Sequence, residues 1–103
     1  MVRVFISQPM AGKTAEEIQA TRERAIQKLE NRFAGKLSVV NPVMQLTEDP
    51  LAALGKALML MSTAEVAYFV PGWENARGCK IENTCAIEYG ITVIEGADEE
   101  SEE

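Results

Sequence analysis

Short apolar runs alternate along the chain with longer segments of mixed polarity, and together they predict seven elements. Four runs are apolar almost throughout, as in strands buried on both faces: residues 2–6, 37–40, 66–70 and 91–94. Three intervening segments have the length and residue spacing of helices: residues 14–32, 50–62 and 75–89. This alternation predicts an α/β fold, a flavodoxin- or Rossmann-like three-layer sandwich around a four-stranded parallel sheet. Because crossovers between parallel strands are right-handed, we expect the strand order 2-1-3-4.

Residues with strong capping and turn preferences mark the ends of these elements. Thr14 and Glu17 have the spacing of a capping box at the start of the first helix. Asp49 followed by Pro50 is a typical start for the second helix, and Asn75 is the expected N-cap of the third. Further boundaries are marked by Ala34-Gly35, Asn41-Pro42 and Gly90.

The segment 50–62 is apolar on nearly every side, in a chain of only 103 residues. A helix in a small domain normally keeps one polar face toward solvent. We therefore expect a second copy of the chain to cover part of this helix, which predicts a homo-oligomer.

Composition is that of an ordinary globular domain, with 47% hydrophobic and 25% charged residues. We expect one domain over residues 1–95 and an acidic, disordered tail over 96–103, which holds five of the 16 acids. The rest of the chain has 11 acids and 10 Lys and Arg, so its net charge is close to zero. This balance gives no indication of a basic surface that would bind a nucleic acid polymer. No apolar run is long enough to span a membrane and no signal peptide is recognisable, so we expect a cytoplasmic protein without a membrane partner.

The chain has no histidine, which excludes Ser-His-Asp, Cys-His and metal-His chemistry. Cys79 and Cys85 lie six positions apart on one predicted helix and point in different directions, so we expect no disulfide between them. We predict no metal site and no cofactor, and interpret both thiols as small buried side chains. Any catalysis must then use carboxylate, tyrosine, lysine or backbone groups.

The stretch from Pro71 to Glu82 combines a sharp turn with a helix that carries a carboxylate on its apolar side. At about 100° per residue, Glu82 falls at the centre of an apolar arc. The arc consists of Gly78, Cys79, Ile81, Cys85, Ala86 and Tyr89. A buried carboxylate is unfavourable unless it is hydrogen-bonded, so Glu82 is either a structural residue or a functional one.

In sheets of this kind ligands bind beyond the carboxyl ends of the strands, where the strand order reverses. For the order 2-1-3-4 this crevice lies between the first and third strands. The loops 7–13 and 71–77 then face each other across it, and Glu82 lies on the same side.

Gly12-Lys13-Thr14 ends like a phosphate-binding P-loop, but that motif requires glycine where the chain has Ser7. We interpret Thr14 as a helix cap and Gly12 as a turn residue, beside backbone amides that can hold an anionic group. In the facing loop, Trp73 either fills the core or stacks on a base. Arg77 is either solvated or hydrogen-bonded to Glu82, a phosphate or a sugar oxygen.

Three parts of the chain resemble a known family: Ile6–Met10, the strand Glu65–Phe69, and Gly72-Trp73-Glu74-Asn75-Ala76-Arg77-Gly78 followed by Glu82. They are similar to the small nucleoside 2-deoxyribosyltransferase-like proteins, many of them from phages and prophages and grouped as DUF4406. The resemblance covers Val2 to Ile94. It implies that Glu82 attacks the anomeric carbon of a 2′-deoxynucleoside, after which a second base or water takes the sugar.

The resemblance also implies that Glu65 assists Glu82 in catalysis, and that the loops bind a nucleoside or nucleoside monophosphate. The implied binding residues are Ser7, Gln8, Met10, Gly12, Gly72, Trp73, Asn75, Arg77 and Gly78. Two positions depart from the family, which commonly has aspartate in place of Glu65 and aspartate or serine in place of Ala76. A non-catalytic nucleotide-binding module and an interaction protein that uses the helix 50–62 therefore remain as alternatives.

Overall fold

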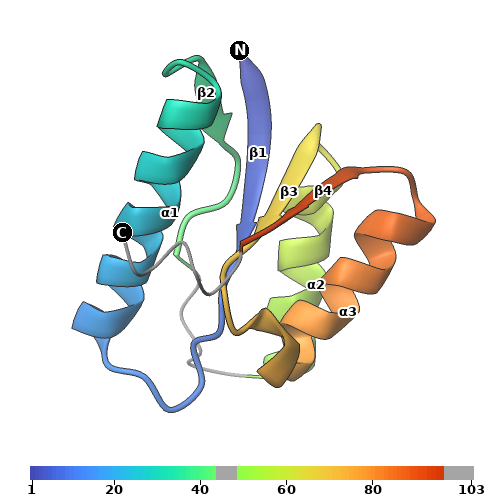
Figure 1. Cartoon of the computed structure of the whole chain (residues 1–103). Helices are drawn as coiled ribbons and strands as arrows, with labels where there is room; N and C mark the ends of the chain where they lie inside the picture. Colours follow the sequence, from blue (N-terminus) through green and yellow to red (C-terminus); the bar gives the residue numbers. More distant parts are fainter. Residues whose placement is uncertain (44–48, 97–103) are drawn as a thin grey trace.

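The computed structural model describes residues 1–43 and 49–96, and its elements follow the predicted order (Figure 1). The strands are β1 (Val2–Ser7), β2 (Leu37–Val39), β3 (Val66–Phe69) and β4 (Thr92–Glu95). The helices are α1 (Ala15–Arg32), α2 (Pro50–Met61), α3 (Arg77–Glu88) and the short 3-10 helix η1 (Trp73–Asn75). Of the predicted tail, only Gly96 lies within the described residues.

The four strands form one parallel sheet in the order β2-β1-β3-β4, which confirms the predicted flavodoxin-like topology. In the register, Val4 of β1 lies opposite Val39 of β2 and Val66 of β3. β1 continues to Ser7, which lies opposite Phe69. The carboxyl ends of the two central strands therefore meet at one edge of the sheet.

Successive side chains of the central strands point to opposite faces and build two hydrophobic clusters. On one face, Val4, Ile6 and Tyr68 pack against Ala25 and Leu29 of α1. On the other face, a second cluster joins the sheet to α2 and α3, with Phe5, Ala67, Phe69, Ala57, Met61 and Ala86. Figure 1 shows α1 on one side of the sheet and α2 and α3 together on the other.

Two of the three predicted helix starts are confirmed. The Thr14 hydroxyl accepts from the Glu17 amide at 3.1 Å, and Glu17 accepts from the Thr14 amide at 2.9 Å, which completes the capping box. Asp49 accepts from the Leu51 amide at 2.9 Å. The prediction for Asn75 is wrong: Asn75 lies at the end of η1, and α3 begins two residues later with Ala76 as an N-cap that has no side-chain bond.

The buried face of α3 is turned relative to the predicted arc. Its buried residues are Cys79, Glu82, Asn83 and Ala86, spaced as one helix face. Glu82 lies inside that face, as expected, whereas Ile81 and Tyr89 are exposed. The predicted arc was wrong to include these two apolar side chains and to leave out the polar Asn83, which is buried.

The second helix keeps a large apolar surface uncovered within one chain. Leu51 and Met59 of α2 are 72% and 73% exposed.

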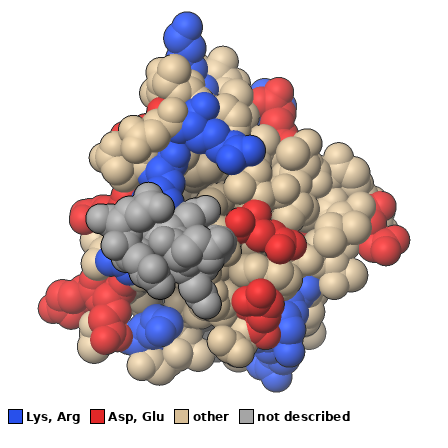
Figure 2. Space-filling view, viewed as in Figure 1, with Lys and Arg blue, Asp and Glu red and all other residues tan. Residues whose placement is uncertain are grey.

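Among the described residues, no helix is both long enough and apolar enough to cross a membrane. On the face shown in Figure 2, Lys and Arg side chains are interspersed with Asp and Glu side chains.

Candidate functional site

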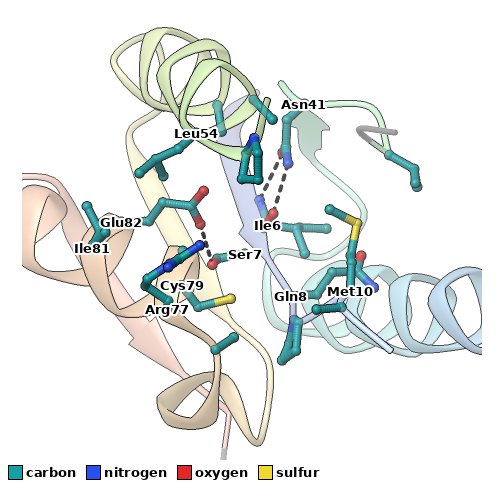
Figure 3. Close-up of a pocket in the computed structure, with 18 of the residues that line it drawn as sticks. Ile6, Ser7, Gln8, Met10, Asn41, Leu54, Arg77, Cys79, Ile81 and Glu82 are labelled. Atoms are coloured by element: carbon teal, nitrogen blue, oxygen red, sulfur yellow. Dashed lines mark hydrogen bonds between the residues drawn. The ribbon is translucent and has the colours of Figure 1, made fainter. Parts of the chain in front are cut away.

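A short hydrogen bond joins β1 to α3 at the carboxyl edge of the sheet. The Ser7 hydroxyl donates to Glu82 Oε1 at 2.6 Å (Figure 3). Ser7 is 2% exposed and Glu82 is 9% exposed, so both polar side chains are removed from bulk water. The buried carboxylate that the sequence marked as an anomaly therefore has a specific partner.

The strand and helix positions explain why these two side chains meet. Ser7 is the last residue of β1, and its carbonyl accepts from the Val70 amide at 3.1 Å, so its backbone is held by the neighbouring strand β3. Glu82 lies one and a half turns into α3, on the face that packs against the sheet. The crossover after β3 thus delivers the carboxylate to the end of β1.

Burial raises the pKa of two acidic side chains of α3, Glu82 and Cys79. Desolvation raises the pKa of Glu82, and the hydrogen bond from Ser7 opposes that rise. Cys79 lies one turn earlier on α3, and burial raises its pKa to about 11, opposed by a hydrogen bond with Ser7 and assisted by the charge of Glu82. Cys79 is therefore an un-ionised thiol near neutral pH and is a poor nucleophile in this state.

Glu82 and Ser7 line a cavity of about 560 Å³. The loop after β1, the segment after β2, the start of α3 and one face of α2 form its walls (Figure 3). Its apolar part comes largely from α2, with Leu51, Ala53, Leu54 and Ala57. Its polar part consists of Ser7, Gln8, Arg22, Asn41, Asp49, Arg77 and Glu82. The volume is typical of sites for small organic ligands, and a few polar groups in an apolar cavity are typical as well.

Six of the predicted site residues meet at this cavity: Ser7, Gln8, Met10, Arg77, Gly78 and Glu82. Gln8 also has a local structural contact, because its Nε2 donates to the Ile18 carbonyl of α1 at 3.0 Å. Arg77 is exposed where it lines the cavity. These positions agree with the predicted meeting of the loops after β1 and β3.

Glu65 is placed elsewhere, and its predicted role beside Glu82 is corrected. It precedes β3 at the amino edge of the sheet, where its exposed side chain accepts from the Arg3 amide at 2.9 Å. The cavity lies at the carboxyl edge. Because β3 runs between the two edges, Glu65 and Glu82 do not act on the same ligand atom within one chain.

Four other predicted binding residues also lie away from the cavity wall. Trp73 is half-buried and packs against the core cluster, with its ring centroid 5.5 Å from that of Phe69 and an interplanar angle of 55°, so of its two expected roles the packing one has a contact in the structure. Gly72 and Asn75 border a separate groove between β3 and α1. Gly12 has φ of 77° in a turn, a conformation that suits glycine, and is not among the cavity residues.

Several cavity residues were not predicted, chiefly Asn41, Arg22 and Cys79. Two of them carried a signal in the sequence. Arg22 follows Ile18 by four positions and precedes Ala25 by three, so it is a cation on the apolar stripe of α1. Asn41 directly follows the predicted strand 37–40, which the order 2-1-3-4 places beside β1, at the ligand-binding edge.

The arrangement suits chemistry that uses the Glu82 carboxylate. Among the described residues, no group of three or more His, Cys, Asp or Glu side chains is placed to hold a metal ion. Ser7 occupies Oε1 of Glu82, which leaves the other carboxylate oxygen for a bond to a ligand. A carboxylate in this position can act as a nucleophile, a general base or a hydrogen-bond acceptor.

Comparison with known proteins assigns the chain to a family but not to a reaction. No curated protein and no solved structure matches the chain. A family model described as a domain of unknown function, DUF4406, matches residues 2–95, which include every described residue of the cavity. The chain therefore belongs to the DUF4406 family.

Proposed function

We propose that the protein acts on the N-glycosidic bond of a 2′-deoxynucleoside or its monophosphate, with Glu82 as the nucleophile. The observation that carries this proposal is the buried Glu82 carboxylate, held by Ser7 at 2.6 Å at the wall of a small-molecule cavity. The resemblance of the Gly72–Gly78 string and Glu82 to nucleoside 2-deoxyribosyltransferase-like proteins supports the same reaction.

The proposed reaction proceeds in two displacements. Glu82 forms a bond to the anomeric carbon while the carbon–nitrogen bond breaks, and the base leaves with the electron pair and takes up a proton. Water or a second base then attacks the same carbon, and the carboxylate leaves. Each displacement passes through an oxocarbenium-like transition state, which a nearby carboxylate stabilises.

The shape and lining of the cavity support a nucleoside as the ligand. Its volume of about 560 Å³ accommodates a base and a sugar. The α2 side chains offer an apolar surface for the flat base, and the polar groups near Ser7 and Gln8 suit sugar hydroxyls. We also propose a homo-oligomer through α2, because this helix exposes Leu51 at the cavity wall and Met59 outside the cavity.

The test is incubation with a panel of 2′-deoxynucleosides and their 5′-monophosphates, with and without a free acceptor base. Chromatography then measures released or exchanged base. We expect product from the wild type and from Glu88→Gln, a matched change at an exposed position of α3, but not from Glu82→Gln. Full turnover by Glu82→Gln would refute the proposal.

A non-catalytic nucleotide-binding module is the second candidate, and one feature of the cavity favours it. Besides Glu82, the one acid that lines the cavity among the described residues is Asp49, and its carboxylate caps α2. Ala76 lines the cavity without any group that can protonate a leaving base. Saturable binding of a nucleotide without product after long incubation would favour this candidate over the enzyme.

A further inference from the structure

The side chain of Asn41 extends the sheet at the edge of the cavity. β2 ends at Val39, and Pro42, which has no amide hydrogen, follows Asn41. Asn41 Oδ1 accepts from the Ile6 amide at 2.9 Å, and Nδ2 donates to the Ile6 carbonyl at 2.8 Å (Figure 3). A carboxamide offers the same donor and acceptor as a peptide group, so it continues the β1–β2 ladder by one step.

This contact fixes the backbone immediately before Ser7. The Val40 amide donates to the Val4 carbonyl at 2.9 Å, and the Asn41 side chain serves Ile6 on the same side of β1. On the opposite side, the Ser7 carbonyl accepts from Val70 at 3.1 Å. The end of β1 is therefore held from both neighbouring strands, although β2 itself is too short to reach it.

Arg22 of α1 in turn holds Asn41. Its Nη2 donates to the Asn41 carbonyl at 2.6 Å. Arg22 is partly buried, and the desolvation lowers its pKa. A guanidinium on the apolar stripe of a helix needs a specific acceptor, and the Asn41 carbonyl is one. Asn41 itself is 6% exposed, so its side-chain amide has little access to competing water.

We propose that Asn41, held by Arg22, is a positioning residue for Glu82: it fixes the end of β1 so that Ser7 Oγ stays bonded to Glu82 Oε1. Its consequence for turnover rests on the proposed function, whereas the link from Asn41 to Glu82 is measurable without any substrate. Neither residue needs to touch the reacting atoms for this role.

The other charged and titratable groups around the cavity restrict which variants can test the effect of Asn41 on Glu82. Arg77 and Cys79 lie on α3, Arg22 on α1 and Asp49 at the start of α2. A variant that alters any of these charges would shift the titration of Glu82 directly. Asn41→Ala changes no charge, so a shift in that variant reports geometry.

The experiment follows the titration of Glu82 by NMR in protein with ¹³C-labelled glutamate side chains, with the resonance assigned by its loss in Glu82→Gln. The bond from Ser7 lowers the Glu82 pKa, so Ser7→Ala moves the midpoint to higher pH. We expect Asn41→Ala to move it in the same direction. The double variant should shift no further than Ser7→Ala alone, because both changes break one interaction.

Val39→Ala is the matched control for a purely structural effect. Val39 packs against the α1-side core from β2, two residues before Asn41, and its side chain has no hydrogen-bond donor or acceptor for the Ile6 backbone. This variant should unfold more easily than the wild type while Glu82 titrates unchanged. A fold-stabilising role alone would make Asn41→Ala behave like Val39→Ala.

An unchanged Glu82 midpoint in folded Asn41→Ala would overturn the proposal. Where Asn41→Ala does not fold, Arg22→Lys decides, because it keeps the charge and shortens the reach to the Asn41 carbonyl. A higher midpoint in Arg22→Lys supports the proposal, and an unchanged one overturns it.

In a turnover assay we expect Asn41→Ala to lower kcat on the order of 10²-fold with little change in KM. A wild type without turnover would refute the proposed function and leave the titration result standing.

Discussion

Two glutamates contact β1 at its opposite ends, and the comparison shows how position sets the chemistry of one residue type. Glu82 accepts from the Ser7 side chain at 2.6 Å and is 9% exposed. Glu65 accepts from the Arg3 backbone amide at 2.9 Å and is exposed. Each of the two side-chain carboxylates therefore accepts a hydrogen bond from the same strand.

The two glutamates differ in their exposure to solvent and in the edge of the sheet at which they lie. Glu82 lines a cavity at the carboxyl edge, where desolvation raises its pKa and strengthens every local electrostatic interaction. Glu65 lies at the amino edge, where water screens its charge and its bond ties two strand starts together. The same functional group is thus suited to chemistry at one edge and to local structure at the other.

The largest expected contrast is in turnover. Glu82→Gln should lower kcat/KM by at least about 10³-fold, because the amide cannot form the covalent intermediate. Glu65→Gln, which keeps an acceptor for the Arg3 amide, should leave kcat/KM within about twofold. Steady-state rates of base release measure both. Equal losses in the two variants would contradict the separation of the two edges.

The pH dependence of turnover sharpens the comparison. Glu82 must be ionised to attack, and burial raises its pKa above the ordinary value, so kcat should rise with pH through that raised value. Ser7 lowers this pKa, so Ser7→Ala should move the acid limb of the profile to higher pH. Rates measured from pH 4 to 8 test this, with Ser38→Ala as the control at an exposed position of β2. A shift toward lower pH in Ser7→Ala would contradict the assigned role of the hydroxyl.

The stability of Glu82→Gln against pH is the third contrast. Because the folded-state pKa of Glu82 is raised, the folded protein binds more protons than the unfolded chain between the ordinary Glu value and the raised one. Wild-type stability therefore falls as pH rises through that window, and the glutamine variant lacks this loss. Urea unfolding should find Glu82→Gln more stable than the wild type at pH 7, with the difference disappearing below the ordinary Glu pKa. A less stable variant at pH 7 would show that the ionised carboxylate is better solvated than its burial indicates.

The smallest effect is expected at the amino edge. Glu65→Ala removes one exposed hydrogen bond to the Arg3 amide, so the free energy of unfolding should fall by about 1 kcal/mol or less. Urea unfolding at pH 7 measures it, with Glu65→Gln as the control that keeps an acceptor. A loss several times larger would mean that this contact organises the sheet.

Local pattern was sufficient for the fold and for the central residue of the site. The apolar strand runs and their alternation with helices predicted the parallel order 2-1-3-4. Helical periodicity placed Glu82 on the buried face of its helix, and the capping box at Thr14 was correct. The elements, the helix face and the cap depend on residues within a few positions of each other, so the sequence displays them directly, and the strand order follows from the elements through the right-handed crossover rule.

The errors arose where distant segments decide the outcome. The apolar periodicity did not show that the short helix η1 precedes α3. Because Asn75 belongs to η1, α3 begins at Arg77 rather than at Asn75. The sequence left open whether Trp73 packs in the core or stacks on a base, and the tertiary structure places its ring against Phe69. The catalytic role of Glu65 was assigned by resemblance. In the structure Glu65 precedes β3, whereas the cavity lies beyond the carboxyl end of that strand.

The sequence by itself determined which elements form, in which order, and that a carboxylate would be buried on the last helix. Only the tertiary structure decided what that carboxylate meets. Strand register brings Ser7 to Glu82 across 75 positions, and the early end of β2 allows the Asn41 side chain to bond Ile6 across 35. Periodicity is a property of one segment, whereas a hydrogen-bond partner depends on how separate segments are placed relative to one another. The sequence therefore showed a buried carboxylate without a partner, and the fold supplied Ser7 as that partner.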